Sequence, residues 1–181
     1  MARKKRPSRT SKKVYCFIVE GCTEENYLNH LKKLYKKSVT IKNCKGGNAK
    51  GVMEKAKKII ENDLFSGYLI WFDKDRYFYE TDYNLKKNLE SKTNVEKIFM
   101  SEPCIEKWLL AHFEETNFNQ PECNFFENRL RDKKYIPNYK KNECMLLEKF
   151  INKNNIDTAI INYPEIGNIL KKYFKIMSGS R

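Results

Sequence analysis

The sequence predicts an α/β fold: a central parallel sheet of about four strands, flanked by helices, with a C-terminal helical extension. Two patterns support this prediction. Short apolar runs of strand length alternate with segments whose apolar residues recur every three or four positions, as in helices. Such alternation is typical of parallel strands joined by right-handed crossovers. Beyond Phe113 the alternation stops and only helical patterns follow.

Four apolar runs supply the predicted strands, at 14–20, 39–43, 68–72 and 95–100. The runs VYCFIVE and YLIWF, the first and third, are almost continuously apolar and rich in β-branched and aromatic residues. That composition suits strands buried on both faces. The first run ends at Glu20, and the third continues directly into Asp73. Each of these two strands therefore delivers an acidic residue at its carboxyl end.

Helical spacing predicts helices at 23–37, 50–62, 81–89 and 103–113. Thr23 is a good N-cap for the first helix, and Pro103 suits the first position of the fourth. In the C-terminal part, helical patterns cover 122–131, 142–153 and 165–174.

Length and charge divide the chain into three parts. The 181 residues are 40% hydrophobic, which suffices for one domain with a real core. Residues 1–13 contain seven basic residues, no acid and no hydrophobic periodicity, which predicts a disordered basic arm. We expect an α/β core at 14–115 and, at 116–181, a helical extension packed on it.

The net charge of +13 favours polyanionic partners: nucleic acid, an acidic membrane face or an acidic protein. Seven of these charges belong to the arm. Three interpretations of the arm stay open: a solubilising tail, a phosphate-binding arm or a nuclear localisation signal.

Two functional classes are excluded by what the sequence lacks. No apolar run approaches the roughly 18 residues of a membrane-spanning helix, and the N-terminus lacks a signal peptide's apolar segment. We therefore expect a cytoplasmic protein without membrane association. The six cysteines form no CxxC motif and no zinc-like Cys/His cluster, so they are expected to be dispersed, reduced thiols.

Acidic residues mark the predicted site. In open α/β sheets, sites form beyond the carboxyl ends of the strands, where Glu20, Asp73 and Asp75 lie. Residues two apart in an extended chain point the same way, so Asp73 and Asp75 can face one ion. Carboxylate oxygens are ligands that Mg²⁺ prefers.

Two more acids fall on the apolar faces of predicted helices. Glu24 shares a face with Tyr27 and Leu31, and Glu106 shares one with Leu109. A carboxylate there is costly unless it is paired, protonated or bound to a metal. A buried ion pair would explain either acid alone, but together with the strand-end acids they favour a cluster.

Two groups of basic residues are candidates for binding substrate phosphates: Lys45, Lys50 and Lys74 near the strand ends, and Lys140 and Lys141 on a second basic surface. Either group can equally be a solvated charged face. His112, six residues after Glu106, is either a core histidine or a member of the site.

These motifs resemble a known family. Residues 20–24 (EGCTE) and 73–75 (DKD) resemble the EGxTE and DxD motifs of Toprim domains. More narrowly, 101–113 (SEPCIEKWLLAHF) resembles the signature of the RloB family, and 139–141 (YKK) resembles its tyrosine–lysine motif. The resemblance covers about 14–175. Three positions depart from the family pattern. Many relatives have lysine at the position of Cys22, phenylalanine at that of Ile105 and leucine at that of Lys107.

The resemblance implies a Toprim-like (Rossmann-like) fold and a metal-dependent nuclease that cleaves DNA or RNA with Mg²⁺ or Mn²⁺. By that likeness Glu20 is the general acid/base or a metal ligand, Asp73 and Asp75 form the metal-binding catalytic pair, and Glu24 and Glu106 are second-metal ligands. It also implies bacterial anti-phage or abortive-infection defence, often with a partner ATPase; a homo-oligomer is open.

Two alternatives differ in class. One is a non-catalytic nucleic-acid-binding or adaptor subunit of a partner ATPase complex. The other is a nucleotidyl-transfer activity, which would extend a labelled strand rather than shorten it.

Overall fold

The computed structural model describes residues 13–62, 64–117, 122–141, 143 and 145–176. Apart from Lys13, the predicted basic arm lies outside the described residues. Within the described part of the chain, no helix is long and apolar enough to cross a membrane.

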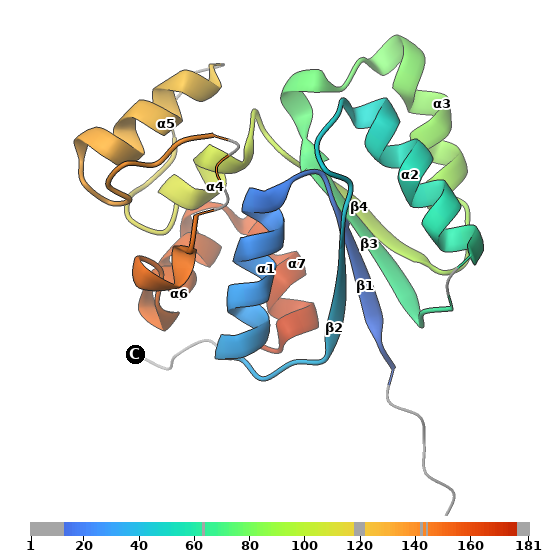
Figure 1. The fold of residues 1–181 in the computed structure, drawn as a ribbon, viewed down its shortest axis with the longest axis horizontal. Helices are drawn as coiled ribbons and strands as arrows, with labels where there is room; N and C mark the ends of the chain where they lie inside the picture. Colours follow the sequence, from blue (N-terminus) through green and yellow to red (C-terminus); the bar gives the residue numbers. More distant parts are fainter. Residues whose placement is uncertain (1–12, 63, 118–121, 142, 144, 177–181) are drawn as a thin grey trace, which may run out of the picture.

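Four parallel strands form the central sheet, as the sequence predicts (Figure 1). The spatial order is β2–β1–β3–β4. The chain passes from β1 outward to β2 and then returns to β3 on the other side of β1, so the order reverses between β1 and β3. In open α/β sheets, this switch point is where ligands bind, beyond the carboxyl ends of the strands. The strands are β1 (Tyr15–Val19), β2 (Val39–Asn43), β3 (Gly67–Asp73) and β4 (Val95–Ser101).

Helices cover both faces of the sheet (Figure 1). On one face, α2 (Ala49–Asn62) and α3 (Tyr79–Glu90) pack on side chains such as Ile70 of β3. On the other, α1 (Cys22–Leu34) and α7 (Pro164–Phe174) pack on side chains such as Trp71. Neighbouring residues of β3 enter opposite cores because side chains alternate along a strand, and all of β3 is buried. The result is an α/β fold consistent with Rossmann-like and Toprim-like architectures.

The C-terminal helices belong to the core on the α1 face. Phe126 of α5 (Cys123–Asp132) and Ile156 of α6 (Lys153–Asn162) are buried in the same cluster as Trp108 of α4 (Ile105–Leu110). Burial of these apolar side chains holds the extension against the first part of the chain. The division of the chain at 115/116 stays a prediction.

The predicted helix at 142–153 is wrong. Of that range, the described residues contain one 3₁₀ turn, Leu147–Lys149, and α6 begins only at Lys153. The start of α6 is fixed by a capping box in which the side chains of Asn152 and Asn155 each accept a hydrogen bond from the other residue's backbone N–H.

Two predicted helix starts also differ. The Glu102–Pro103 peptide bond is cis, and α4 begins at Ile105 rather than at Pro103. Helix α1 begins at Cys22 with Gly21 as its N-cap residue, so Thr23 lies inside the first turn and is buried instead of capping the helix.

Candidate metal centre at the carboxyl edge of the sheet

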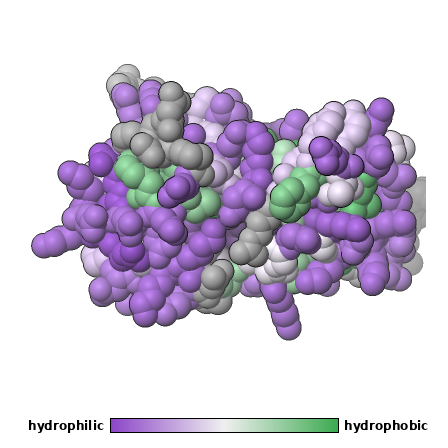
Figure 2. Space-filling view, turned by 90° about the horizontal axis from the view of Figure 1, so that it is seen from above, coloured by the Kyte–Doolittle hydropathy of each residue, from purple (hydrophilic) through white to green (hydrophobic). Residues whose placement is uncertain are grey.

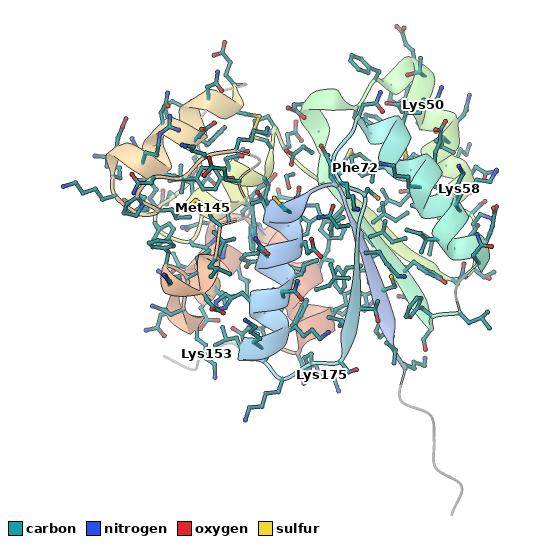
Figure 3. All side chains as sticks on the ribbon, in the orientation of Figure 1. Lys50, Lys58, Phe72, Met145, Lys153 and Lys175 are labelled. Carbon is teal, nitrogen blue, oxygen red and sulfur yellow. A yellow bond between two sulfur atoms is a disulfide. The ribbon has the colours of Figure 1, made fainter. Side chains whose placement is uncertain are left out.

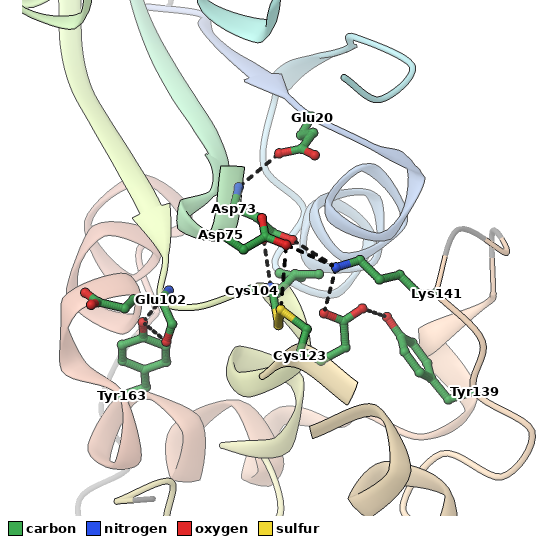
Figure 4. The surroundings of a disulfide bond; sticks show 11 residues. Glu20, Asp73, Asp75, Glu102, Cys104, Cys123, Tyr139, Lys141 and Tyr163 are labelled. Carbon is green, nitrogen blue, oxygen red and sulfur yellow. Dashed lines mark hydrogen bonds and ion pairs between the residues drawn. A yellow bond between two sulfur atoms is a disulfide. The ribbon is translucent and has the colours of Figure 1, made fainter. Parts of the chain in front are cut away.

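The carboxyl ends of the two central strands are joined by hydrogen bonds that involve the predicted acids (Figure 4). Glu20 directly follows β1, and its Oε2 accepts a hydrogen bond of 3.0 Å from the backbone N–H of Asp73, the last residue of β3. Asp73 Oδ1 in turn accepts one of 2.8 Å from the backbone N–H of Ile105, the first residue of α4. The loop before α4 is thereby held against the switch point.

Glu24 and Glu106 enter the same place from two helices. Glu24 lies in the first turn of α1 and is 3% exposed, while Glu106, the second residue of α4, is fully buried. Both side chains therefore face inward, as the helical periodicity predicts. The structure brings Glu20, Glu24, Asp73 and Glu106 together around one cavity of about 50 Å³. A cavity of this size has room for a cation with a few waters, since one water needs roughly 10–15 Å³.

Lys141 supplies the positive charge among these acids. Its Nζ lies 3.7 Å from Asp73 Oδ2, 3.8 Å from Glu106 Oε2 and 3.9 Å from Asp75 Oδ2 (Figure 4). Burial lowers the pKa of Lys141, but the surrounding carboxylates outweigh this effect and the net pKa is raised. The lysine is thus held protonated in the centre of the cluster.

One lysine does not balance the buried negative charge. Burial, with the charges of Glu20 and Glu106, raises the pKa of Glu24 to about 7. Burial, with Glu24 and the other acids, raises the pKa of Asp73 well above its usual value. The pKa of Glu106 is raised by burial too, although Lys141 and Tyr139 oppose this. Perturbed carboxylates of this kind are typical of functional sites.

Tyr139 orients Glu106. The tyrosine is buried, and its hydroxyl donates a hydrogen bond of 2.9 Å to Glu106 Oε1. The other oxygen, Oε2, is buried and accepts no hydrogen bond within the described part of the chain. In the sequence, Tyr139 appears only within the short motif 139–141. Its contact with Glu106 could not be predicted, because it lies in a loop that has no hydrophobic periodicity.

The remaining predicted residues lie around the cavity or away from it. Asp75 does not line the cavity; its side chain is 29% exposed and contacts the cluster through Lys141. Lys45 is exposed next to Gly46, which lines the cavity. Lys50 is exposed on α2 (Figure 3), and Lys74 and Lys140 are exposed and pair with Glu102 and Glu143. Of the five predicted lysines, the structure places only Lys141 among the acids.

His112 lies in the hydrophobic core rather than at the cavity. Its Nδ1 is 2.9 Å from the backbone carbonyl of Trp108, which can only accept, so Nδ1 carries the proton. Nε2 then accepts from the hydroxyl of Tyr27, at 2.9 Å. Burial lowers the pKa of His112 to about 4, which keeps the ring neutral at physiological pH.

The expectation of dispersed, reduced cysteines is wrong, since three of the described cysteines, Cys22, Cys104 and Cys123, are disulfide-bonded. Cys104 and Cys123 form a disulfide between the residue before α4 and the first residue of α5 (Figure 4). Their spacing of 19 residues matches no motif, because the contact arises when α5 folds back beside α4. Cys16 and Cys44 are buried and take part in no disulfide bond.

The end of the molecule that carries this centre is covered mainly by hydrophilic residues, with small hydrophobic patches between them (Figure 2). Fold and site together define an α/β protein with an acid-lined cavity at the switch point of a parallel sheet. The family model described as RloB-like protein matches residues 15–168, and the chain belongs to this family. No curated protein and no solved structure matches the chain.

Proposed function

We propose that the chain is a metal-dependent nuclease that hydrolyses phosphodiester bonds of DNA or RNA. One observation carries the proposal: four carboxylates from three separate segments, together with a lysine, surround one cavity at the switch point. Metal-dependent phosphodiester hydrolysis uses carboxylates to hold cations, which offset charge on the phosphate and at the attacking and leaving oxygens. Family membership further supports a role in bacterial anti-phage defence beside a partner ATPase.

The residues at the cavity fit a hard divalent cation. Glu106 Oε2 is a buried oxygen that accepts no hydrogen bond within the described residues, and Glu24 and Asp73 have raised pKa values in the absence of a cation. Glu20, Glu24, Asp73 and Glu106 would hold Mg²⁺ or Mn²⁺ through oxygen, with Asp75 at the rim. When bound, the cation supplies Lewis-acid stabilisation and lowers the pKa of a bound water.

The chain's own residues then have separate tasks. The hydrogen bond from the Asp73 backbone fixes the Glu20 carboxylate, which is placed to accept a proton from the attacking water. Lys141 lines the cavity, and its ammonium group would contact a substrate phosphate there. Lys45, exposed beside the cavity-lining Gly46, holds the neighbouring part of the strand.

The test is cleavage of labelled single-stranded and double-stranded DNA and RNA by the full chain with Mg²⁺ or Mn²⁺. The informative variant is Glu20→Gln, because the amide oxygen can still accept the hydrogen bond from Asp73 while the charge is removed. We expect cleavage that a chelator abolishes and that Glu20→Gln loses, with the exposed Glu54→Gln as the control. No cleavage of any substrate, or cleavage that survives Glu20→Gln, contradicts the proposal.

A second candidate is binding of nucleic acid or of a partner without cleavage. The exposed rings of Phe78 and Tyr79, 62% and 66% accessible, favour it, because they follow Asp75 closely and can stack on bases or on a partner. Binding that is retained when all the acids are neutralised, with no cleavage by the wild-type chain, would identify this function instead.

Tyr139→Phe should weaken Mg²⁺ or Mn²⁺ binding by about 10–100-fold, because Glu106 loses the hydrogen bond that orients it. The measurement is calorimetric titration of the cation. The matched control is Tyr135→Phe, which also removes a tyrosine–glutamate hydrogen bond, but one to Glu114, outside the cavity. Equal affinities in the Tyr139 variant and the wild type would show that Glu106 needs no such partner.

A further inference from the structure

Two cysteines and one of the acids form a group beside the proposed magnesium centre. The sulfurs of Cys104 and Cys123 and a carboxylate oxygen of Glu106 all lie within 4.8 Å of one another (Figure 4 shows the cysteines). Cys104 and Glu106 are fully buried, whereas Cys123 is partly exposed and gives solvent access. Asp75 Oδ2, 3.8 Å from Cys123 Sγ, adds an oxygen on the exposed side.

The donor set of this group differs from that of the acid cavity. Thiolates select borderline-soft cations such as Zn²⁺ or Co²⁺, whereas the oxygen ligands of the cavity suit Mg²⁺. Independently of the cysteines, Glu106 Oε2 is buried and accepts no hydrogen bond in the described part of the chain, although Lys141 Nζ lies 3.8 Å away, so this oxygen can still bind a cation.

The distance between the backbones of Cys104 and Cys123 permits either a disulfide or two thiolates bound to one metal ion. A Cα–Cα distance of 6.0 Å is normal for a disulfide. It also allows both sulfurs to bind one tetrahedral ion, since two sulfurs about 2.3 Å from zinc lie about 3.8 Å apart. The same two sulfurs cannot do both at once.

We propose that, once the disulfide is reduced, Cys104, Cys123 and Glu106 form a binding site for Zn²⁺ or a similar borderline-soft cation. Reduction by a dithiol transfers two electrons and two protons to the pair and leaves the reductant as a disulfide. Cation binding then releases the two thiol protons, because thiolates are the ligands. Glu106 belongs both to this group and to the acid cavity. If the cavity holds Mg²⁺, as the proposed function requires, Zn²⁺ bound at the cysteines also removes one ligand from the magnesium centre.

The test uses Co²⁺ as a spectroscopic probe on the full chain, reduced with a phosphine under anaerobic conditions. We expect a thiolate-to-cobalt charge-transfer band in the near ultraviolet that saturates at about one equivalent and is displaced by Zn²⁺. The oxidised chain should show no band. Cys123→Ser should lose it, and Glu106→Gln should bind Co²⁺ at least about tenfold more weakly. The matched control is Cys44→Ser, which removes a buried thiol on the other face of the sheet.

A band of equal strength in Cys123→Ser, or affinity unchanged by Glu106→Gln, would place the cation elsewhere and overturn the proposal. No band in the reduced wild type overturns it as well. Should Cys123→Ser fail to fold, alkylation of the wild-type chain decides: Zn²⁺ must protect Cys123 in the reduced protein, and unprotected alkylation counts against the site. None of these measurements depends on nuclease activity, so failure here and failure of the proposed function are distinguishable.

Discussion

Asp73→Asn should reduce metal-dependent cleavage by about a thousandfold or more, since a catalytic cation contributes several kcal/mol and 1.4 kcal/mol is a factor of ten. The same variant should make the metal-free protein more stable at about pH 8, because it removes a buried charge whose pKa is raised by burial and by the neighbouring acids. The hydrogen bond from Ile105 is kept, because the amide oxygen of asparagine accepts it as the carboxylate does.

Opposite changes in activity and stability distinguish a metal ligand from a structural residue. Cleavage rates and chemical denaturation with a chelator present provide the two measurements. Asp132→Asn, an exposed change at the end of α5, is the control and should affect neither. If Asp73→Asn loses activity and stability together, Asp73 acts mainly through the fold.

The metal-free protein should lose stability as the pH rises from about 4.5 to about 7, the interval between the ordinary pKa of Glu24 and its folded-state value. In that interval the folded chain holds a proton on Glu24 that the unfolded chain has released, so rising pH favours unfolding. The stabilisation that the protonated Glu24 gives the folded state is fully present below this pH interval and is lost above it. It amounts to roughly 3 kcal/mol, at 1.36 kcal/mol for each pH unit.

Glu24→Gln isolates this effect, because glutamine resembles the protonated acid. The free energy of unfolding of the variant minus that of the wild type should be near zero at about pH 4 and rise to roughly 3 kcal/mol by about pH 8. Glu54→Gln, on the exposed side of α2, should show no such trend. With saturating Mg²⁺ at about pH 8, the wild type should instead be more stable than Glu24→Gln. The cation stabilises the folded state that binds it, and only the wild type keeps all the carboxylate ligands. A difference that stays constant with pH would contradict a raised pKa at Glu24.

Periodicity explains why much of the site could be predicted. Glu24 and Glu106 are buried because three- and four-residue spacing places them on the apolar faces of their helices, and Asp73 follows from the end of a continuously apolar strand. The parallel sheet follows from alternation alone. These signals are local in sequence, so they do not depend on knowing how distant segments meet.

The rest depended on contacts between distant segments. Tyr139 meets Glu106 across 33 residues, and the partner of Cys104 is set by where α5 begins. The apolar residues of 142–153 fit one face of a helix, which is why the sequence predicts a helix there. In the structure only part of these apolar residues enter the core: Leu147 is buried, but Leu146 is 57% exposed. The pair Asn152 and Asn155, three apart, was the signal that the helix starts later.

Lys141 gives the chain an internal counterion. Its ammonium group, carried by a C-terminal loop, lies within 4 Å of Asp73, Asp75 and Glu106, where it offsets part of their charge before any ion arrives from solution. In domains whose folding is driven by a metal, the bound ion supplies this compensating charge, whereas here part of it comes from the chain itself. Under the proposed function, binding of a metal ion would therefore replace one cation with another, because the ammonium group of Lys141 already lies among the same carboxylates.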